Sequence, residues 1–198
     1  MTANAADRSA TAGRGRAAVF LDRDGVLVRA EVRNGKSYAP RRLKDFRLLP
    51  GASESVRALH DRGFLTVVVT NQPDIGNGLV SADVVEAMHA IMRRKLPLDA
   101  IEVCPHRQAD DCPCRKPKAG LLIAAAEQFS LDLSASFVVG DRSSDIVAGR
   151  SAGCYTLFLD RGYDRCTDVR PDAVVRSLRQ AVQHILNRAV APEKKSTR

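Results

Sequence analysis

Residues 17–26 read Ala17-Ala18-Val19-Phe20-Leu21-Asp22-Arg23-Asp24-Gly25-Val26, so an apolar run of the length of a buried strand leads directly into two acids and a glycine. Side chains two positions apart in an extended segment point the same way, which places Asp22 and Asp24 on one face. Neighbouring carboxylates repel each other unless a cation or a shared proton relieves the repulsion. The stretch therefore indicates a divalent-metal site at the end of a strand, against the alternative of a solvated turn.

Three later segments contribute further polar residues, and two of them are again apolar runs that end in polar groups. A second apolar run ends in Thr70 and Asn71, a third ends in Gly140 and Asp141, and Lys116 precedes an expected helix. The carboxyl ends of parallel strands meet at one edge of an open sheet, where ligands bind. We expect the polar residues of these segments to meet there.

The spacing of apolar residues and of turn residues predicts an α/β chain with a parallel sheet. Strands are expected at 17–21, 64–70, 97–103, 136–140, 155–159 and 172–175, and helices at 52–61, 82–95, 120–129, 146–152 and 178–186. Asn34-Gly35 indicates a basic hairpin within 27–45, and 71–80 is expected to be a loop. His89 falls on the apolar spacing of its helix, which favours a surface or packing role over metal binding.

The length of 198 residues suits one domain. We expect a single domain at 17–188 between disordered tails at 1–16 and 189–198. The absence of an apolar signal-peptide core or of an apolar run long enough to span a bilayer predicts a cytoplasmic protein without a membrane partner.

The net charge of +8 raises the question of nucleic acid, but each tail carries +2 of it. The remaining field suits an anionic small molecule. With 5% aromatic residues and no Trp, stacking surfaces for single strands are not evident. We expect a phosphorylated small-molecule substrate, no nucleic-acid partner and a monomer.

Four metal-ligand side chains gather within eleven residues: Cys104, His106, Cys112 and Cys114. Three thiols and one imidazole match a closed tetrahedral Zn²⁺ site, and no open position is suggested. The alternative is a reduced loop with incidental thiols. The pattern predicts a structural zinc that holds this loop in place.

Taken in order, the four polar segments resemble the motifs of the haloacid dehalogenase-like (HAD) phosphohydrolases over residues 17 to about 160. The zinc pattern directly before Arg115-Lys116-Pro117 resembles the subgroup of heptose bisphosphate and histidinol-phosphate phosphatases. The resemblance implies a three-layer α/β/α Rossmann-like HAD fold with a central parallel sheet, a minimal cap and a zinc-binding loop. It implies a Mg²⁺-dependent phosphoric monoester hydrolase.

By this resemblance, Asp22 is the nucleophile that forms an aspartyl-phosphate. Asp24 protonates the leaving oxygen and later activates water. Mg²⁺ is held by Asp22, the backbone carbonyl of Asp24 and Asp141. Asp145 is either a supporting group or a charge on the helix surface, and Asp141 can also cap the next helix.

The resemblance also implies which residues hold the substrate. Thr70 and Lys116 bind the phosphoryl oxygens, although Thr70 can also be a plain strand residue. Asn71, Arg115 and Lys116 match positions that contact substrate. Since no large insertion separates the motifs, short loops must select the substrate.

The closest resemblance is to the D-glycero-D-manno-heptose-1,7-bisphosphate 7-phosphatases. Pro73-Asp74 and Asn77 depart from that pattern, and the five-residue gap between His106 and Cys112 resembles the histidinol-phosphate branch. Two alternatives stay open: a histidinol-phosphate phosphatase, and a non-enzymatic zinc-stabilised module that binds phosphorylated ligands.

Overall fold

A six-stranded parallel sheet forms the centre of the computed structural model, which describes residues 15–166 and 169–190. The strands lie in the order β5-β4-β1-β6-β7-β8. Their bounds are Ala18–Leu21 (β1), Leu65–Asn71 (β4), Ala100–Cys104 (β5), Phe137–Gly140 (β6), Tyr155–Leu159 (β7) and Ala173–Val175 (β8). The chain runs outward from β1 to β5 and then returns to β6 on the other side of β1. The carboxyl end of β1 therefore lies at the switch point where open α/β sheets bind ligands.

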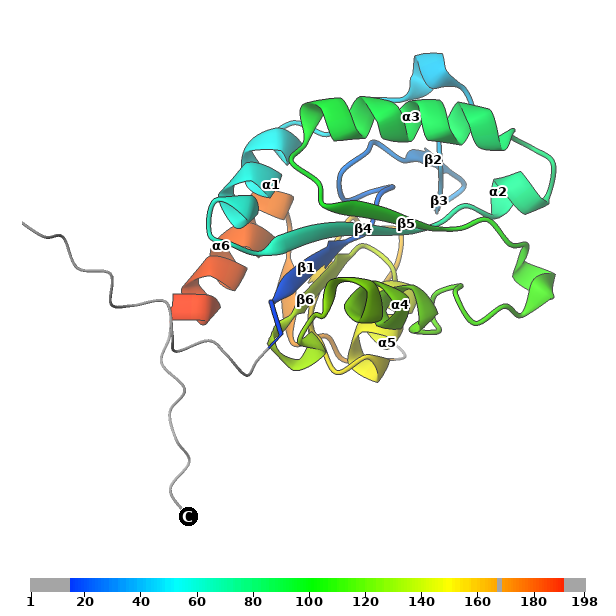
Figure 1. Ribbon diagram of the computed structural model, residues 1–198. Helices are drawn as coiled ribbons and strands as arrows, with labels where there is room; N and C mark the ends of the chain where they lie inside the picture. The colour runs from blue at the N-terminus through cyan, green and yellow to red at the C-terminus, as the bar shows by residue number, and fades with distance from the viewer. Residues whose placement is uncertain (1–14, 167–168, 191–198) are drawn as a thin grey trace, which may run out of the picture.

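Helices cover both faces of this sheet (Figure 1). One face carries α1 (Ala52–His60), α3 (Ala82–Lys95) and α6 (Leu178–Val190), and the other carries α4 (Gly120–Phe129) and α5 (Ser143–Ser151). This is the three-layer α/β/α fold that the motifs imply.

The sheet is buried on both sides because alternate strand residues face opposite layers. In β1, Val19 and Leu21 pack with the α1, α3 and α6 layer, whereas Ala18 and Phe20 pack with α4 and α5. All four are fully buried. Burying a side chain as large as Phe20 contributes roughly 2 kcal/mol, so the strand that carries both acids is firmly anchored.

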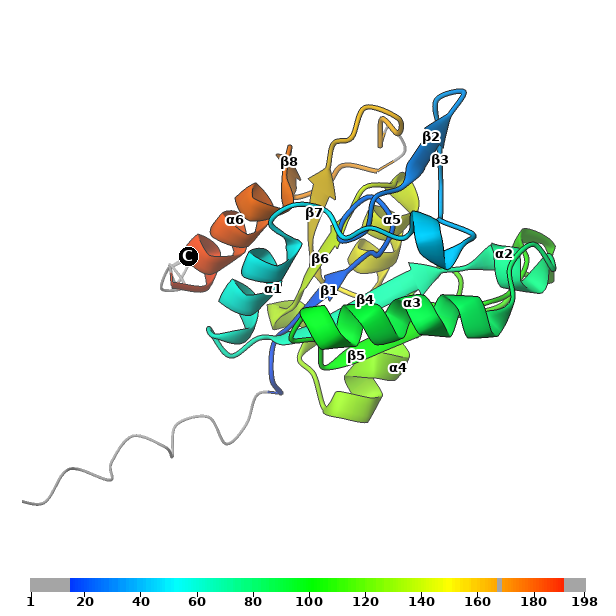
Figure 2. The same cartoon turned by 90° about the horizontal axis from the view of Figure 1, so that it is seen from above.

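A small antiparallel hairpin stands apart from the main sheet (Figure 2). It joins β2 (Glu31–Arg33) to β3 (Lys36–Tyr38) through Asn34 and Gly35, both of which have positive φ. The predicted hairpin is confirmed.

The structure differs from the predicted elements in one missed helix and in several boundaries. A short helix, α2 (Pro73–Gly76), lies within the stretch predicted as a loop, because Pro73 suits the first turn of a helix. Helix α5 begins at Ser143 and not at 146. Helix α6 continues to Val190, so residues 189 and 190 of the predicted C-terminal tail belong to its last turn. Arg16 of the predicted N-terminal tail forms a bridge with Leu131. The rest of both predicted tails, 1–14 and 191–198, lies outside the described residues.

Short 3₁₀ turns complete the connections at Leu43–Asp45, Gln108–Asp110 and Leu133–Ala135. No helix in the described part of the chain is long and apolar enough to cross a membrane.

Candidate active site

Three buried carboxylates meet beyond the carboxyl ends of β1 and β6. Asp22 follows β1, Asp141 follows β6, and Asp145 lies in the first turn of α5. One oxygen of each lies within 4.8 Å of the others. Asp145 is 2% exposed, so it is not the helix-surface charge that the sequence left open.

Lys116 supplies a cation to this cluster. Its Nζ lies 2.6 Å from Asp22 Oδ1 and 2.6 Å from Asp145 Oδ1, and it donates to the Val69 carbonyl at 2.7 Å. Burial alone lowers the pKa of Lys116, but the charges of Asp145 and then Asp22 outweigh it and leave the pKa raised. Lys116 therefore stays an ammonium ion beside the predicted nucleophile.

Lys116 forms ion pairs with Asp22 and Asp145, and Asp141 is the third carboxylate of the cluster. Burial raises its pKa well above the usual value, and the charges of Asp22 and Asp145 raise it further. The Tyr163 hydroxyl donates to Oδ2, whereas Oδ1 has no hydrogen-bond partner among the described residues. A hard divalent cation would satisfy this oxygen and relieve the repulsion, so the cluster fits Mg²⁺.

A glycine borders the same cluster. Gly25 has a φ of 94°, and a Cβ at this position would collide with the Asp141 carboxylate and the Tyr163 hydroxyl. The turn after Asp24 therefore requires glycine for its backbone conformation and for the space it leaves at the acids.

Asp24 lies beside the carboxylate cluster but has other hydrogen-bond partners. Its Oδ2 accepts from Gln72 Nε2 at 2.8 Å and from Arg23 Nε at 3.0 Å. Its side chain is not a member of the three-carboxylate group. A contribution of Asp24 to the metal would thus come through its backbone carbonyl, as the resemblance implies.

Thr70 lies at the end of β4 with its side chain buried. Its hydroxyl accepts a 2.9 Å hydrogen bond from Gln72 Nε2, the same group that binds Asp24. Gln72 was not among the predicted site residues. Its position after the strand-end Thr70-Asn71 pair was the available signal.

Asn71 holds the backbone of Lys116. Its Nδ2 donates to the Lys116 carbonyl at 3.0 Å, and its Oδ1 accepts from the Lys116 amide at 3.1 Å. The neighbouring Arg115 has a buried Nη1 without a hydrogen-bond partner in the described part of the chain. Asn71 and Arg115 both border the cavity beside the acids.

This cavity has a volume of about 530 Å³ and is lined by polar residues from several elements. Asp22, Asp24 and Asp145 line it together with Thr70 and Lys116. Tyr38 and Arg41 from the hairpin region, and Asp74 and Asn77 from α2 and its end, line other parts. Its size is that of a typical small-molecule site.

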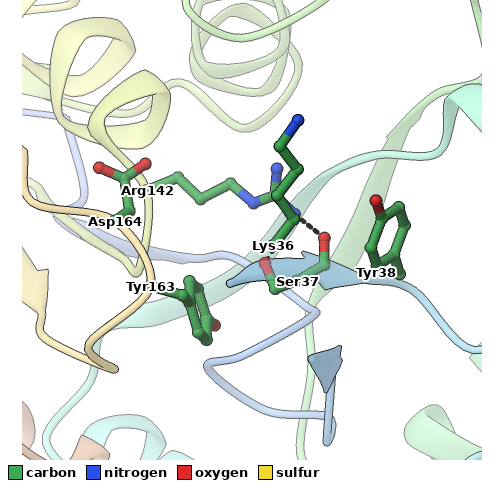
Figure 3. Close-up of a pocket in the computed structure, with 6 residues that line it drawn as sticks. All are labelled: Lys36, Ser37, Tyr38, Arg142, Tyr163 and Asp164. Carbon is green, nitrogen blue, oxygen red and sulfur yellow. Dashed lines mark hydrogen bonds between the residues drawn. The ribbon is translucent and has the colours of Figure 1, made fainter. Parts of the chain in front are cut away.

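Two arginines connect the hairpin region to other elements around the cavity. Arg142 donates to the carbonyl of Ser37 at 2.6 Å and to its hydroxyl at 2.7 Å (Figure 3). Arg41 Nε donates to Asp74 Oδ2 at 2.6 Å. Sequence reasoning missed the role of Arg142, because the contact joins residues 105 positions apart.

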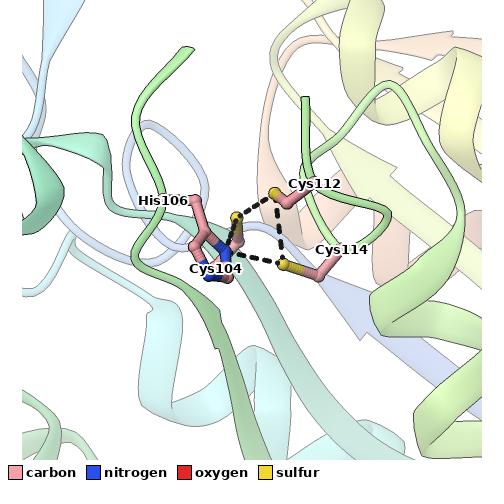
Figure 4. A group of neighbouring side chains, drawn as sticks. All are labelled: Cys104, His106, Cys112 and Cys114. Atoms are coloured by element: carbon pink, nitrogen blue, oxygen red, sulfur yellow. Dashed lines mark hydrogen bonds between the residues drawn. The ribbon is translucent and has the colours of Figure 1, made fainter. Parts of the chain in front are cut away.

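The four predicted zinc ligands lie together after β5 (Figure 4). Cys104 Sγ lies 3.5 Å from Cys112 Sγ, which lies 3.4 Å from Cys114 Sγ, and His106 Nδ1 lies 3.2 Å from Cys114 Sγ. Burial raises the pKa of the Cys104 thiol to about 12. A soft divalent cation would stabilise the thiolates, and the donor set is compatible with Zn²⁺.

Comparisons with known proteins agree with this geometry. A family model described as HAD-hydrolase-like matches residues 113–181. A D-glycero-D-manno-heptose-1,7-bisphosphate 7-phosphatase of Thermosynechococcus vestitus is 35% identical over 86% of this chain and 95% of its own length. A D-glycero-alpha-D-manno-heptose-1,7-bisphosphate 7-phosphatase of Burkholderia mallei is 36% identical over 83% of this chain and 91% of its own length.

A solved structure is similar as well. The D,D-heptose 1,7-bisphosphate phosphatase of B. bronchiseptica, complexed with magnesium and phosphate, superimposes with a TM-score of 0.77 and 28% identity. The superposition covers 87% of this chain and 99% of that one.

The fold and the acidic site define a HAD-like hydrolase, as the motifs predicted. The similarity of most of the chain to the two curated relatives identifies a narrower family within this class. The chain belongs to the family of the D-glycero-D-manno-heptose-1,7-bisphosphate 7-phosphatases.

Proposed function

We propose that this protein is a Mg²⁺-dependent phosphatase that removes the 7-phosphate of D-glycero-D-manno-heptose 1,7-bisphosphate through an aspartyl-phosphate. The observation that carries the proposal is the placement of Asp22, buried against Lys116 and two further carboxylates at the end of a cavity. The names of the relatives and the magnesium and phosphate of the B. bronchiseptica structure support the substrate and the cation.

In the first half of the reaction, a carboxylate oxygen of Asp22 attacks phosphorus and the bond from phosphorus to the sugar oxygen breaks. Asp24 gives its proton to that oxygen. Lys116 and Thr70 hold the phosphoryl oxygens as negative charge shifts among them.

In the second half, water replaces the sugar. Asp24, now a carboxylate, takes a proton from the water as it attacks the aspartyl-phosphate. Inorganic phosphate leaves, and Asp22 and Asp24 return to their starting states. The two acids thus need the different surroundings that the structure gives them.

Asp22, the backbone carbonyl of Asp24 and Asp141 would hold Mg²⁺, with Asp145 beside them. When bound, the cation offsets the charge of the phosphoryl group and of the acids. Asp145 fixes the site from the protein side, since its Oδ2 accepts from the Arg142 amide at 3.0 Å while its Oδ1 holds Lys116.

Cys104, His106, Cys112 and Cys114 form a structural Zn²⁺ site in this proposal. Its role follows from its position, because Arg115 and Lys116 come directly after the last ligand. Zinc would fix the start of the segment that places the side chains of Arg115 and Lys116 at the cavity. Cysteine ligands must stay reduced to bind the metal, which is in keeping with a cytoplasmic location.

The substrate would lie along the cavity with its reacting phosphate at Asp22. Arg115 and Asn71, with Lys116, are proposed to contact it. The proposal also includes a single domain over residues 17–188, a monomeric state, and no nucleic-acid or membrane partner.

The test is phosphate release from both anomers of D-glycero-D-manno-heptose 1,7-bisphosphate, and from histidinol phosphate, with Mg²⁺ and with EDTA. A Mg²⁺-dependent preference for a heptose bisphosphate is expected, with loss of turnover in Asp22→Asn. Preference for histidinol phosphate would instead assign the protein as a histidinol-phosphate phosphatase. Binding of either ester without turnover would favour the non-enzymatic module.

A further inference from the structure

A buried chain of polar side chains lies behind Asp24. Arg23 is fully buried, and its Nε donates to Asp24 Oδ2 at 3.0 Å. Its Nη2 lies 2.9 Å from the same oxygen as an ion-pair contact. Its Nη1 lies 3.0 Å from Nε2 of His89, a residue of α3 that is only 2% exposed.

The chemistry of the two groups assigns the direction of the last contact. A guanidinium carries only donors, so the ring nitrogen of His89 must accept. His89 is then neutral with its proton on Nδ1, 3.8 Å from the Glu86 carboxylate. Burial, and then the charge of Arg23, lowers the pKa of His89 to about 4, so the accepting form persists at neutral pH.

In this network, one carboxylate oxygen of Asp24 is hydrogen-bonded and the other is not. Oδ2 receives Arg23 Nε and Gln72 Nε2, whereas Oδ1 has no hydrogen-bond partner among the described residues. A carboxyl group that exchanges a proton with a leaving group needs one free oxygen in a fixed direction. Only Oδ1 meets this requirement.

A fully buried arginine is a costly way to fill space in a core, because apolar residues of similar volume pack at least as stably. The hydrogen bonds of Arg23, and not its bulk, therefore best explain an arginine at this position. Because the guanidinium is planar, a partner for Nη1 on the side away from Asp24 holds the orientation of the whole group, and His89 is that partner.

We propose that His89 is a positioning residue: by accepting a hydrogen bond from Arg23, it fixes the guanidinium that holds Asp24 with Oδ1 directed at the leaving oxygen. The inference rests on the proposed function, in which Asp24 is the general acid. It assigns to α3, which contributes no side chain to the cavity lining, a part in the first chemical step.

The experiment compares two phosphate esters by their kcat/KM. This quantity covers only the steps up to departure of the leaving group, so the later use of Asp24 as a base does not enter. An alkyl phosphate such as the heptose ester needs a proton on its leaving oxygen, whereas p-nitrophenyl phosphate has a stable leaving anion. Misplacement of the general acid should therefore affect the alkyl ester selectively.

His89→Leu removes the acceptor at similar volume, and His89→Gln restores an acceptor oxygen. We expect His89→Leu to lower kcat/KM at least about tenfold for the alkyl ester and by no more than about threefold for the aryl ester. His89→Gln should keep both within about threefold of wild type. His89→Met takes the place of the leucine variant if that protein does not fold.

Met92→Ala is the matched control, because it damages the packing of the same helix one turn further on while leaving the hydrogen bonds of Arg23 to Asp24 and His89 in place. Its ratio of alkyl to aryl activity should equal that of wild type. An equal loss for both esters in His89→Leu, or a glutamine variant as impaired as the leucine variant, would show a packing role only and overturn the inference.

The proposed function fails separately. A wild-type protein that hydrolyses neither ester contradicts the phosphatase, and the inference falls with it. A wild-type protein that turns over both esters and loses this in Asp22→Asn, with an unchanged ratio in His89→Leu, contradicts the role of His89 alone.

Discussion

The carboxylate cluster and the Cys/His cluster can each hold a divalent cation, but they are assembled in opposite ways. Asp22 is more than a hundred residues away in sequence from Asp141 and Asp145, and the fold buries all three together. The Cys/His ligands come from eleven consecutive residues and three of the four are only half-buried or exposed.

The difference shows how the two sites depend on the rest of the molecule. The carboxylate cluster exists only because β1 and β6 are adjacent, and its repulsion is offset by Lys116. The Cys/His loop has little apolar burial of its own and would depend on its metal for order. Loss of a ligand should therefore affect activity at the first cluster and stability at the second.

The largest effect is expected for Asp22→Asn. Removal of the nucleophile should lower kcat by at least about 10³-fold. The melting temperature should change little, because the amide oxygen can still accept from Lys116 and one charge leaves a repelling group. Phosphate release and thermal unfolding measure the two quantities, and a folded variant with retained turnover would contradict the assignment.

A large effect on stability is expected for Cys112→Ser. The variant should bind no stoichiometric Zn²⁺ and should lose on the order of 3 kcal/mol of unfolding free energy. Metal analysis and urea unfolding provide the measurement. Ser134→Ala, at an exposed position outside both clusters, is a control for substitution alone. Unchanged zinc content in Cys112→Ser would remove this ligand from the site.

Acid should act on the two regions differently, because His89 is linked through Arg23 to Asp24 and not to the Cys/His cluster. An unfolded histidine protonates near pH 6.5, but folded His89 does so only near pH 4. Its contribution to stability is present above pH 6.5 and is lost as the pH falls towards 4. The groups that face it are Arg23, Glu86 and Arg93.

Wild type should thus lose about 2 kcal/mol more than His89→Gln between pH 7 and pH 5 in urea unfolding. Zinc content measured in parallel shows whether the Cys/His loop of wild type and of His89→Gln binds the same amount of metal at each pH. Identical pH dependence of the two proteins would mean that His89 is not buried in its neutral form.

The smallest effect is expected at the joint between the two regions. Asn71 follows Thr70 at the end of β4, pairs in register with Cys104 and holds the backbone of Lys116. Asn71→Ala should remove two hydrogen bonds worth about 1 kcal/mol each and lower kcat about tenfold. A rise in KM at unchanged kcat would show that Asn71 acts through the proposed substrate contact alone and not by holding Lys116.

Much of the architecture followed from local patterns. Apolar runs ending in polar residues marked β1, β4 and β6, and Asn34-Gly35 marked the hairpin, because turn and strand preferences act over a few residues. Helix α2 escaped prediction since proline and glycine signal a loop and the first turn of a helix alike.

The types and order of the reactive groups could be read from local sequence. The Cys/His ligands and their spacing could be read in the same way, since neighbours along the chain must stay neighbours in space. Only the tertiary structure decided that Asp145 joins Asp22 and Lys116, that Gln72 bridges Asp24 and Thr70, and that His89 reaches Arg23 across 66 positions. These contacts depend on how strands and helices pack and on which rotamers the packing allows. No local pattern carries that information.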